Sequence, residues 1–206
     1  MIKLTEQNSK NDPAEYDRIF AERAKKGPNW QDVRRWREMT RYFKGGVVTD
    51  IGCLDSQVSE HLTGEFKYMG TDVAKEAIKK MTELYPYSNR TFLVDDIYKS
   101  KIQDEVSDYT ILGEVLEHLE RPADAIKEAF RILKHGGVLA VSVPLEESIE
   151  PGAVDAERHL WSYTKQDVLD LVKPYAKKTK TKILRSKWFP KYKYCWPQLI
   201  VWATKL

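Results

Sequence analysis

Short apolar runs that alternate with helix-like segments constrain the fold of this chain more than any other feature. Runs with the length and the side chains of β-strands occupy residues 47–51, 67–71, 91–94, 109–112 and 138–143. Helix-like segments occupy residues 57–62, 74–84, 115–119 and 122–133. This alternation predicts a mainly parallel sheet with right-handed crossovers and helices on both faces. We interpret His135-Gly136-Gly137 as the cap that ends the last of these helices.

The segments on either side of this alternation have different patterns. Residues 1–45 predict helices, the first of which begins at Asp12-Pro13, because aspartate caps a helix well and proline suits its first position. Near the other end, Thr164 and Asp167 have the spacing of a capping box and predict the start of another helix.

The last part of the chain predicts the edge of the sheet. Strand-like runs at 181–188 and 198–204 suit an antiparallel hairpin there. The 206 residues contain no internal repeat and no low-complexity linker, so we interpret the chain as one doubly wound domain. Its expected parts are a helical lid over 1–45, a core over 46–172 and a basic, aromatic edge hairpin over 173–206.

Composition excludes two broad classes of protein. With 42% hydrophobic and 32% charged residues, the chain has the composition neither of a disordered protein nor of a membrane protein. No apolar run approaches the ~20 residues that span a bilayer, and the first residues lack the apolar centre of a signal peptide. Two cysteines, Cys53 and Cys195, form no disulfide framework. We therefore expect a cytoplasmic protein, and the sequence leaves its oligomeric state open.

Each of the first four strand-like runs ends in an acidic residue. These residues are Asp50, Asp72, the pair Asp95 and Asp96, and Glu114. Because ligands of open α/β sheets bind outside the carboxyl ends of the strands, we expect these carboxylates to line one cleft. Such a negative rim repels a pyrophosphate and attracts a nucleoside cofactor that carries positive charge, hydroxyls and an amine.

The turn after the first strand also argues against a dinucleotide. A dinucleotide-binding turn needs the spacing G-x-G-x-x-G, whereas this turn has a single glycine, Gly52. The segment 48–53, Val-Thr-Asp-Ile-Gly-Cys, instead resembles motif I of class I S-adenosylmethionine-dependent methyltransferases, in the group that includes the ubiquinone-biosynthesis O-methyltransferases. The segments 114–119, 131–139 and 159–164 resemble further motifs of that family, and the likeness extends over about 16–172.

The resemblance implies a fold, a cofactor and a reaction. The fold is a seven-stranded, Rossmann-like sheet whose last strand is antiparallel. The cofactor is S-adenosylmethionine, released as S-adenosylhomocysteine, and the methyl group goes to O or N of a small acceptor. By resemblance Asp72 binds the ribose hydroxyls, Asp96 faces the adenine amine and Glu114 borders the transferred methyl group. The implied cofactor-binding residues are Asp50, Gly52, Cys53, Asp72, Val73, Asp96, Ile97 and Glu114.

Two positions depart from the family pattern. Leu54 and Ser56 stand where the family usually has glycines. A Cβ at Leu54 could crowd the cofactor or require a shifted turn. This departure leaves open an alternative function, that of a protein that binds the cofactor without catalytic activity.

Histidines are the candidates for a general base, since they titrate near neutral pH. His118 and His159 lie near the expected acceptor side and are our catalytic candidates, while His61 and His135 suit structural roles. On one helix, Glu114, Glu117 and His118 share a face, and with His159 they could hold a divalent cation. Some relatives use a metal at this E-x-x-E-H pattern and many others lack one, so we assign no metal ligand.

The net charge of +3 hides an asymmetry. From Lys173 onward there are ten Lys and Arg residues and no acidic residue, so the preceding part of the chain is net negative. A basic tail suits an anionic acceptor or a membrane surface. Its lysines, interleaved with aromatic residues over 187–196, also suit nucleic acid, so an RNA-binding protein or an RNA methyltransferase is the second reading. The same residues could simply pack and solvate an edge hairpin.

Overall fold

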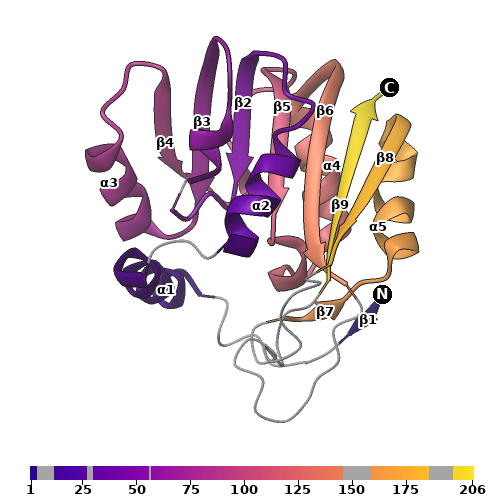
Figure 1. Cartoon of the computed structure of the whole chain (residues 1–206), viewed down its shortest axis with the longest axis horizontal. Helices are drawn as coiled ribbons and strands as arrows, with labels where there is room; N and C mark the ends of the chain where they lie inside the picture. The colour runs from indigo at the N-terminus through magenta and orange to yellow at the C-terminus, as the bar shows by residue number, and fades with distance from the viewer. Residues whose placement is uncertain (4–11, 27–29, 56, 146–158, 186–196) are drawn as a thin grey trace.

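A seven-stranded sheet organises the molecule. The computed structural model describes residues 1–3, 12–26, 30–55, 57–145, 159–185 and 197–206 (Figure 1). The sheet has the order β4-β3-β2-β5-β6-β9-β8, and within it only β9 runs antiparallel to its neighbours. The strands are β2 (Gly46–Ile51), β3 (Phe66–Asp72), β4 (Arg90–Val94), β5 (Ser107–Gly113), β6 (Leu133–Pro144), β8 (Ala176–Leu184) and β9 (Gln198–Lys205).

Helices cover both faces of this sheet. The described α-helices are α1 (Pro13–Lys26), α2 (Trp30–Met39), α3 (Lys75–Leu84), α4 (Pro122–Ile132) and α5 (Lys165–Val172). Short 3₁₀ helices follow β2, β4 and β5, namely η1 (Gln57–His61), η2 (Ile97–Lys99) and η3 (Leu116–His118), and η4 (Lys173–Tyr175) follows α5. In Figure 1, α2 lies in front of the sheet, and α4 and α5 lie behind it. A short ribbon of β1 (Ile2–Lys3) and β7 (Trp161–Ser162) lies apart from the main sheet.

Two apolar clusters fix these layers. One cluster joins α4 and α5 to alternate residues of the central strands, such as Leu139 and Val141 of β6. The other joins α1, α2 and α3 to the opposite face, where Ala140 and Trp202 contribute. Neighbouring residues of a strand face opposite sides of a sheet, so a strand buried on both faces needs an unbroken apolar run. The run 138–143 is of this kind.

The predicted fold class is confirmed. The predicted strands, the antiparallel edge and the capping box at Thr164 are all present, and Thr164 Oγ1 accepts a hydrogen bond from Asp167 N at 3.2 Å. The runs 57–62 and 115–119 form 3₁₀ turns, which are shorter than the helices we predicted. The predicted strand 181–188 begins earlier, at Ala176, and its residues 186–188 lie outside the described part of the chain.

One boundary was wrong. His135-Gly136-Gly137 does not cap α4, because α4 ends at Ile132 and β6 begins at Leu133. Leu133 is already extended and pairs with Ser107 of β5. Gly136 adopts a φ of +75° within β6, in the left-handed region that glycine enters without strain. The glycines therefore allow an irregular start of a strand.

None of the described helices combines the length and the hydropathy that a bilayer-crossing helix requires.

Candidate functional site

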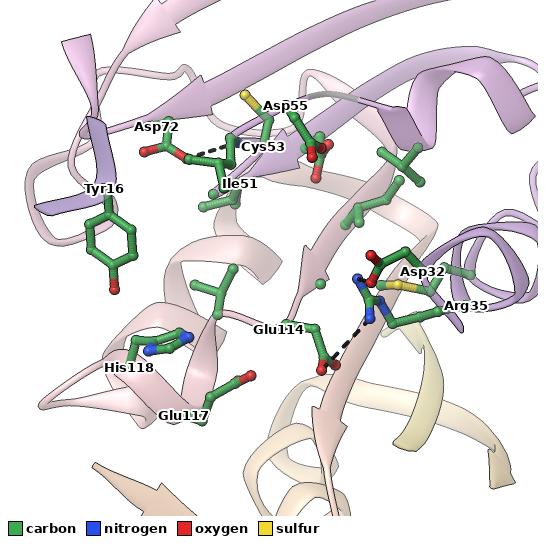
Figure 2. Close-up of a pocket in the computed structure, with 18 of the residues that line it drawn as sticks. Tyr16, Asp32, Arg35, Ile51, Cys53, Asp55, Asp72, Glu114, Glu117 and His118 are labelled. Atoms are coloured by element: carbon green, nitrogen blue, oxygen red, sulfur yellow. Dashed lines mark hydrogen bonds and ion pairs between the residues drawn. The ribbon is translucent and has the colours of Figure 1, made fainter. Parts of the chain in front are cut away.

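A cavity of about 420 Å³ opens at the carboxyl ends of β2, β3 and β5. The first turns that follow these strands line it from one side, and side chains of α1 and α2 line it from the other. Its size lies within the range of small-molecule sites. Figure 2 shows Tyr16 of α1 and Arg35 of α2 facing the residues of the strand ends across this cavity.

The turn after β2 is held by the backbone of β3. Gly52 N and Cys53 N both donate to Thr71 O, at 2.8 and 2.9 Å. Gly52 has a φ of +74° and Leu54 a φ of +38°. Leu54 thus occupies the left-handed region at one of the positions where the resembled family usually has glycine, at the steric cost that a Cβ brings there. The turn keeps its left-handed geometry despite the leucine.

Asp72 locks this turn to the next strand. Its Oδ2 accepts a hydrogen bond from Leu54 N at 2.9 Å, and its Oδ1 accepts one from Ala74 N at 2.9 Å. Burial raises the pKa of Asp72 above its ordinary value, although the hydrogen bonds from Ala74 and Leu54 oppose the shift. The carboxylate is therefore fixed in position and lines the cavity.

Asp50, at the end of β2, is a buried acid of the cavity wall. Its Oδ2 accepts a hydrogen bond of 2.6 Å from the hydroxyl of Tyr68. Burial raises the pKa of Asp50 to about 7, against the opposing effect of the Tyr68 hydrogen bond, and Asp55 and Asp72 add to the rise. A positive charge placed nearby would lower that pKa again, so this site favours a cationic ligand.

The two acids after β4 have separate places. Asp95 lines the cavity together with Ile97. Asp96 is not among the residues that line it, and its Oδ1 instead caps η2 by accepting from Tyr98 N at 2.9 Å. The resemblance implied Asp96 as the adenine partner, whereas the geometry brings Asp95 into the cavity.

Glu114 has the least common backbone conformation among the predicted site residues that carry a Cβ. It follows β5 with a φ of +57°, which is uncommon for a residue with a Cβ. Its Oε1 accepts from Ser142 Oγ at 2.8 Å and its Oε2 from Gln198 Nε2 at 3.2 Å. Arg35 Nη1 lies 3.8 Å from Oε2, and Figure 2 shows this ion pair. The strained residue is thus held by β6, β9 and α2 together.

Sequence reasoning missed Arg35 as a site residue. It is buried in the cavity wall, where it pairs with Asp32 of its own helix at 3.0 Å as well as with Glu114. The arginine-rich pattern of α2 marked a helix but did not separate this buried arginine from its exposed neighbours. The i, i+3 spacing of Asp32 and Arg35 was the available signal.

A second group of polar side chains lies at the other end of the cavity. Glu117, His118 and His159 each offer a ligand atom, and these atoms lie within 4.8 Å of one another. The rings of His118 and His159 are 4.8 Å apart, and Tyr16 contacts His118 edge-on. We call Glu117, His118 and His159 the acceptor-side triad. Among the described residues, these three could hold a divalent cation, and Glu114 does not belong to the group.

The predicted shared helical face of Glu114, Glu117 and His118 was wrong. Only Leu116–His118 is helical, as a 3₁₀ turn, and Glu114 precedes it in a left-handed conformation. Glu114 therefore faces Arg35 (Figure 2), while Glu117 and His118 belong to the triad with His159.

Most of the predicted site residues meet in this cavity. Those that line it are Asp50, Gly52, Cys53, Asp72, Val73, Ile97, Glu114, His118 and His159. His61 and His135 are not among the lining residues: His61 stacks on Trp36, and His135 Nδ1 contacts Leu206 O at 2.6 Å. Ser56 lies outside the described residues.

Comparison with known proteins supports the resemblance predicted from the motifs. Residues 49–141 match a family model described as a methyltransferase domain. A curated relative, the 2-methyl-6-phytyl-1,4-hydroquinone methyltransferase of Synechocystis sp., is 28% identical over 53% of this chain. The match spans 36% of that relative's length. The predicted resemblance to class I methyltransferases is thereby confirmed over the middle of the chain.

Solved structures share the fold. The N-methyltransferase NodS of Bradyrhizobium japonicum, crystallised with S-adenosyl-L-homocysteine, superimposes with a TM-score of 0.73 at 17% identity and covers 95% of this chain and 98% of its own. A chain from the complex of the Haloferax volcanii Trm112 methyltransferase activator with a methyltransferase gives the same TM-score and identity, over 93% of this chain and 98% of that one. The Rossmann-like methyltransferase fold is therefore established.

Proposed function

We propose that this chain is an S-adenosylmethionine-dependent methyltransferase that acts on an O or N atom of its acceptor. The observation that carries the proposal is the cavity at the strand ends, where four successive strands each contribute an acid. The residues that match the methyltransferase domain, 49–141, supply most of that cavity. One fold can host many activities, so we infer the activity from the chemistry of these residues and not from the fold alone.

The cofactor half of the cavity fits a cationic adenosine compound. The Asp72 carboxylate accepts backbone hydrogen bonds from Leu54 N and Ala74 N, and a carboxylate has about four acceptor sites, which leaves capacity for a ribose hydroxyl. A Cβ on Gly52 would lie 2.6 Å from Val115 Cγ2, so only glycine fits where the turn approaches Val115 at the cavity wall. Asp50 and Glu114 place negative charge at the end of the cavity that we assign to the amino-acid part of the cofactor.

When bound, S-adenosylmethionine supplies an electrophilic methyl group on a sulfonium. The chain's own contribution is orientation, exclusion of water and acceptance of a proton. His118 and His159 both line the cavity, and either can take the acceptor's proton on a ring nitrogen. Glu117, buried beside them, stabilises the resulting imidazolium and is a positioning residue. We assign the acceptor to this end of the cavity.

Leu54 does not prevent this function in our proposal. The left-handed backbone at Leu54 points its N–H at Asp72, as a glycine there would. The alternative of a cofactor binder without catalytic activity predicts tight binding of the cofactor together with no transfer to any acceptor. Transfer of a labelled methyl group to any added acceptor would separate the two.

The proposal is tested by calorimetric titration of the full chain with S-adenosylmethionine, with S-adenosylhomocysteine and, for comparison, with NAD⁺. We expect saturable heat with the first two compounds and none with NAD⁺, because a pyrophosphate meets the acidic rim. Absence of heat at millimolar S-adenosylmethionine and S-adenosylhomocysteine would refute the proposal. Binding of NAD⁺ alone would replace it with a dinucleotide site.

A further inference from the structure

A second hollow, distinct from the cavity described above, lies between β8 and the end of α2. It has a volume of about 340 Å³ and is lined by Arg41, Tyr42, Lys180, Thr181, Lys182 and Trp202. β8 is the last strand of the sheet, at the right in Figure 1, and α2 lies in front of the sheet. The hollow therefore sits in the angle between an edge strand and a helix.

The edge strand carries a row of lysines beside this hollow, of which Lys180 and Lys182 line it. Lys178, Lys180 and Lys182 alternate along β8, so their side chains leave the same face of the sheet. That face is the α2 side, because Lys180 pairs in register with Trp202, a member of the apolar cluster that includes α2. Lys178 and Lys180 are exposed, and Lys182 is partly exposed.

Two arginines lie on the other side of the hollow. Arg34 lies on α2 and Arg41 in the turn that follows α2, and both are exposed. Arg34 Nη1 donates to the backbone oxygen of Arg185 at 3.1 Å, just beyond the end of β8. We call the space between the lysines and these arginines the β8–α2 groove; its walls are Arg34, Glu38, Arg41, Lys178, Lys180, Lys182 and Arg185.

Glu38 is the one acid among these seven wall residues. It accepts hydrogen bonds from Lys182 on one wall and from Arg41 on the other. Burial alone would raise the pKa of Glu38, but the hydrogen bonds from Arg41 and Lys182 lower it, so it stays ionised. The six cations of the wall therefore leave a strong positive excess.

The floor of the groove is aromatic. Tyr42 and Trp202 meet edge to face with their ring centres 5.0 Å apart. The ammonium of Lys180 lies 4.1 Å from the centre of the Tyr42 ring. A base can take the place of that ammonium over Tyr42, while the lysine turns to a phosphate. A positive groove with an aromatic face is the arrangement that single-stranded nucleic acids bind.

The groove runs toward the edge of the sheet where the cavity opens. Leu184, the last residue of β8, pairs with Gln198 of β9, and Gln198 donates to Glu114 in the cavity wall. Arg34 of α2 and Arg41 just after α2 belong to the groove, whereas Asp32 and Arg35 of α2 line the cavity. A nucleic acid bound along β8 toward Leu184 would therefore run toward the edge of the sheet that holds the cavity.

We propose that the β8–α2 groove binds the phosphate chain of a single-stranded nucleic acid and presents one nucleotide to the cavity as the acceptor. Lysines on an edge strand also serve to prevent pairing with another sheet, but that role needs neither the two arginines nor an aromatic floor. The binding part of this proposal stands on the groove alone. The acceptor part rests on the proposed methyltransferase function.

The test is the fluorescence anisotropy of labelled uridine and thymidine oligonucleotides of about twelve nucleotides, titrated with the full chain without cofactor. We expect both to bind and to weaken between about 50 and 200 mM salt. The triple variant Lys178→Gln, Lys180→Gln, Lys182→Gln should lose about tenfold in affinity and flatten the salt dependence by about two log units per log unit of salt. The two oligonucleotides differ in the 2′-hydroxyl and in the C5-methyl group of the base, so an oligodeoxyuridine is added as a third probe. A preference between the uridine and deoxyuridine oligonucleotides identifies RNA or DNA as the bound nucleic acid.

A charge-matched control is the triple variant Lys75→Gln, Lys79→Gln, Lys80→Gln on α3, at the far side of the sheet (Figure 1). It removes the same charge and should keep the wild-type affinity. Glu38→Gln should strengthen binding, because it frees Lys182 and Arg41 for phosphates. A folding defect would weaken binding, so it cannot account for an increase in affinity.

The proposal is overturned if both triple variants lose affinity equally, if neither loses it, or if Glu38→Gln does not bind more tightly. It is also overturned if polyglutamate or phosphatidylserine vesicles bind as tightly as the oligonucleotides and respond to the β8 triple variant in the same way. Failure here with intact binding of S-adenosylhomocysteine leaves the methyltransferase proposal standing. Loss of cofactor binding with intact oligonucleotide binding refutes only the acceptor part.

Discussion

The two halves of the cavity are built in different ways. On the cofactor side, Asp72 is held by backbone N–H groups from its own loop and from the turn after the neighbouring strand. On the acceptor side, Glu117 and His118 come from a 3₁₀ turn and His159 from a segment more than forty residues later. Backbone geometry thus prepares one half, and side chains brought together by tertiary packing form the other. We expect substitutions in the first half to change affinity and those in the second half to change rate.

The largest expected effect is that of Asp72→Ala on cofactor affinity. The variant loses the carboxylate that we assign to the ribose and leaves Leu54 N and Ala74 N without their acceptor. We expect the affinity for S-adenosylhomocysteine, measured by calorimetry, to fall at least about 100-fold.

Asp96→Ala is the matched control for this prediction. It removes an acid only one strand away, whose carboxylate caps η2 and does not line the cavity. We expect a stability loss of about 1 kcal/mol and nearly unchanged affinity. Equal losses of affinity in the two variants would show that the cofactor is read by Asp96, as the resemblance implied.

The next effect concerns turnover. His159→Ala should reduce turnover about 100-fold while cofactor affinity is kept, because a general base acts on rate. A parallel His118→Ala variant identifies which imidazole takes the proton, and His135→Ala, outside the cavity, should behave as wild type. If turnover of both His118→Ala and His159→Ala equals that of wild type, the triad is structural.

A smaller effect appears in stability against pH. The folded-state pKa of Asp50 is raised to about 7, so the folded state binds this proton more tightly than the unfolded state does. Stability from this group is therefore present at low pH and is lost as pH rises to about 7. Asp50→Asn keeps an acceptor for Tyr68 and should be more stable than wild type above neutral pH in denaturant titrations, with the difference shrinking as pH falls.

Asp108→Asn should behave in the opposite way. Burial alone would raise the pKa of Asp108, but hydrogen bonds from Val47 N and Lys134 lower it. Its contribution to stability is present above the ordinary carboxyl pKa and is lost as pH falls. A similar pH response of Asp50→Asn and Asp108→Asn would contradict both assignments.

The smallest expected effect is that of metal removal. Because we assign proton transfer, and not metal binding, to the acceptor-side triad, turnover should survive exhaustive chelation and dialysis. Loss of turnover, restored by a divalent cation, would instead assign Glu117, His118 and His159 to a metal.

The sequence predicted the layers of the fold and the meeting of the strand-end acids in one cavity, for a local reason. Strand periodicity and the acid at each strand end are local patterns, and parallel pairing then brings Asp50, Asp72 and Glu114 to one edge. Other features depend on distant contacts. The left-handed backbone of Glu114 is held by Ser142, Gln198 and Arg35, none of which is near it in sequence. That Asp95 lines the cavity while Asp96 caps η2 depends on the local conformation of one turn, which no periodicity determines.

The central claim is that a row of strand-end carboxylates cradles a cationic adenosine compound. A crystal structure of the full chain with S-adenosylhomocysteine tests it most directly. The account predicts that the ribose hydroxyls lie within hydrogen-bonding distance of the Asp72 carboxylate, with the amino-acid end near Asp50 and Glu114. A ligand bound elsewhere, or one in this cavity whose ribose faces away from Asp72, would contradict it.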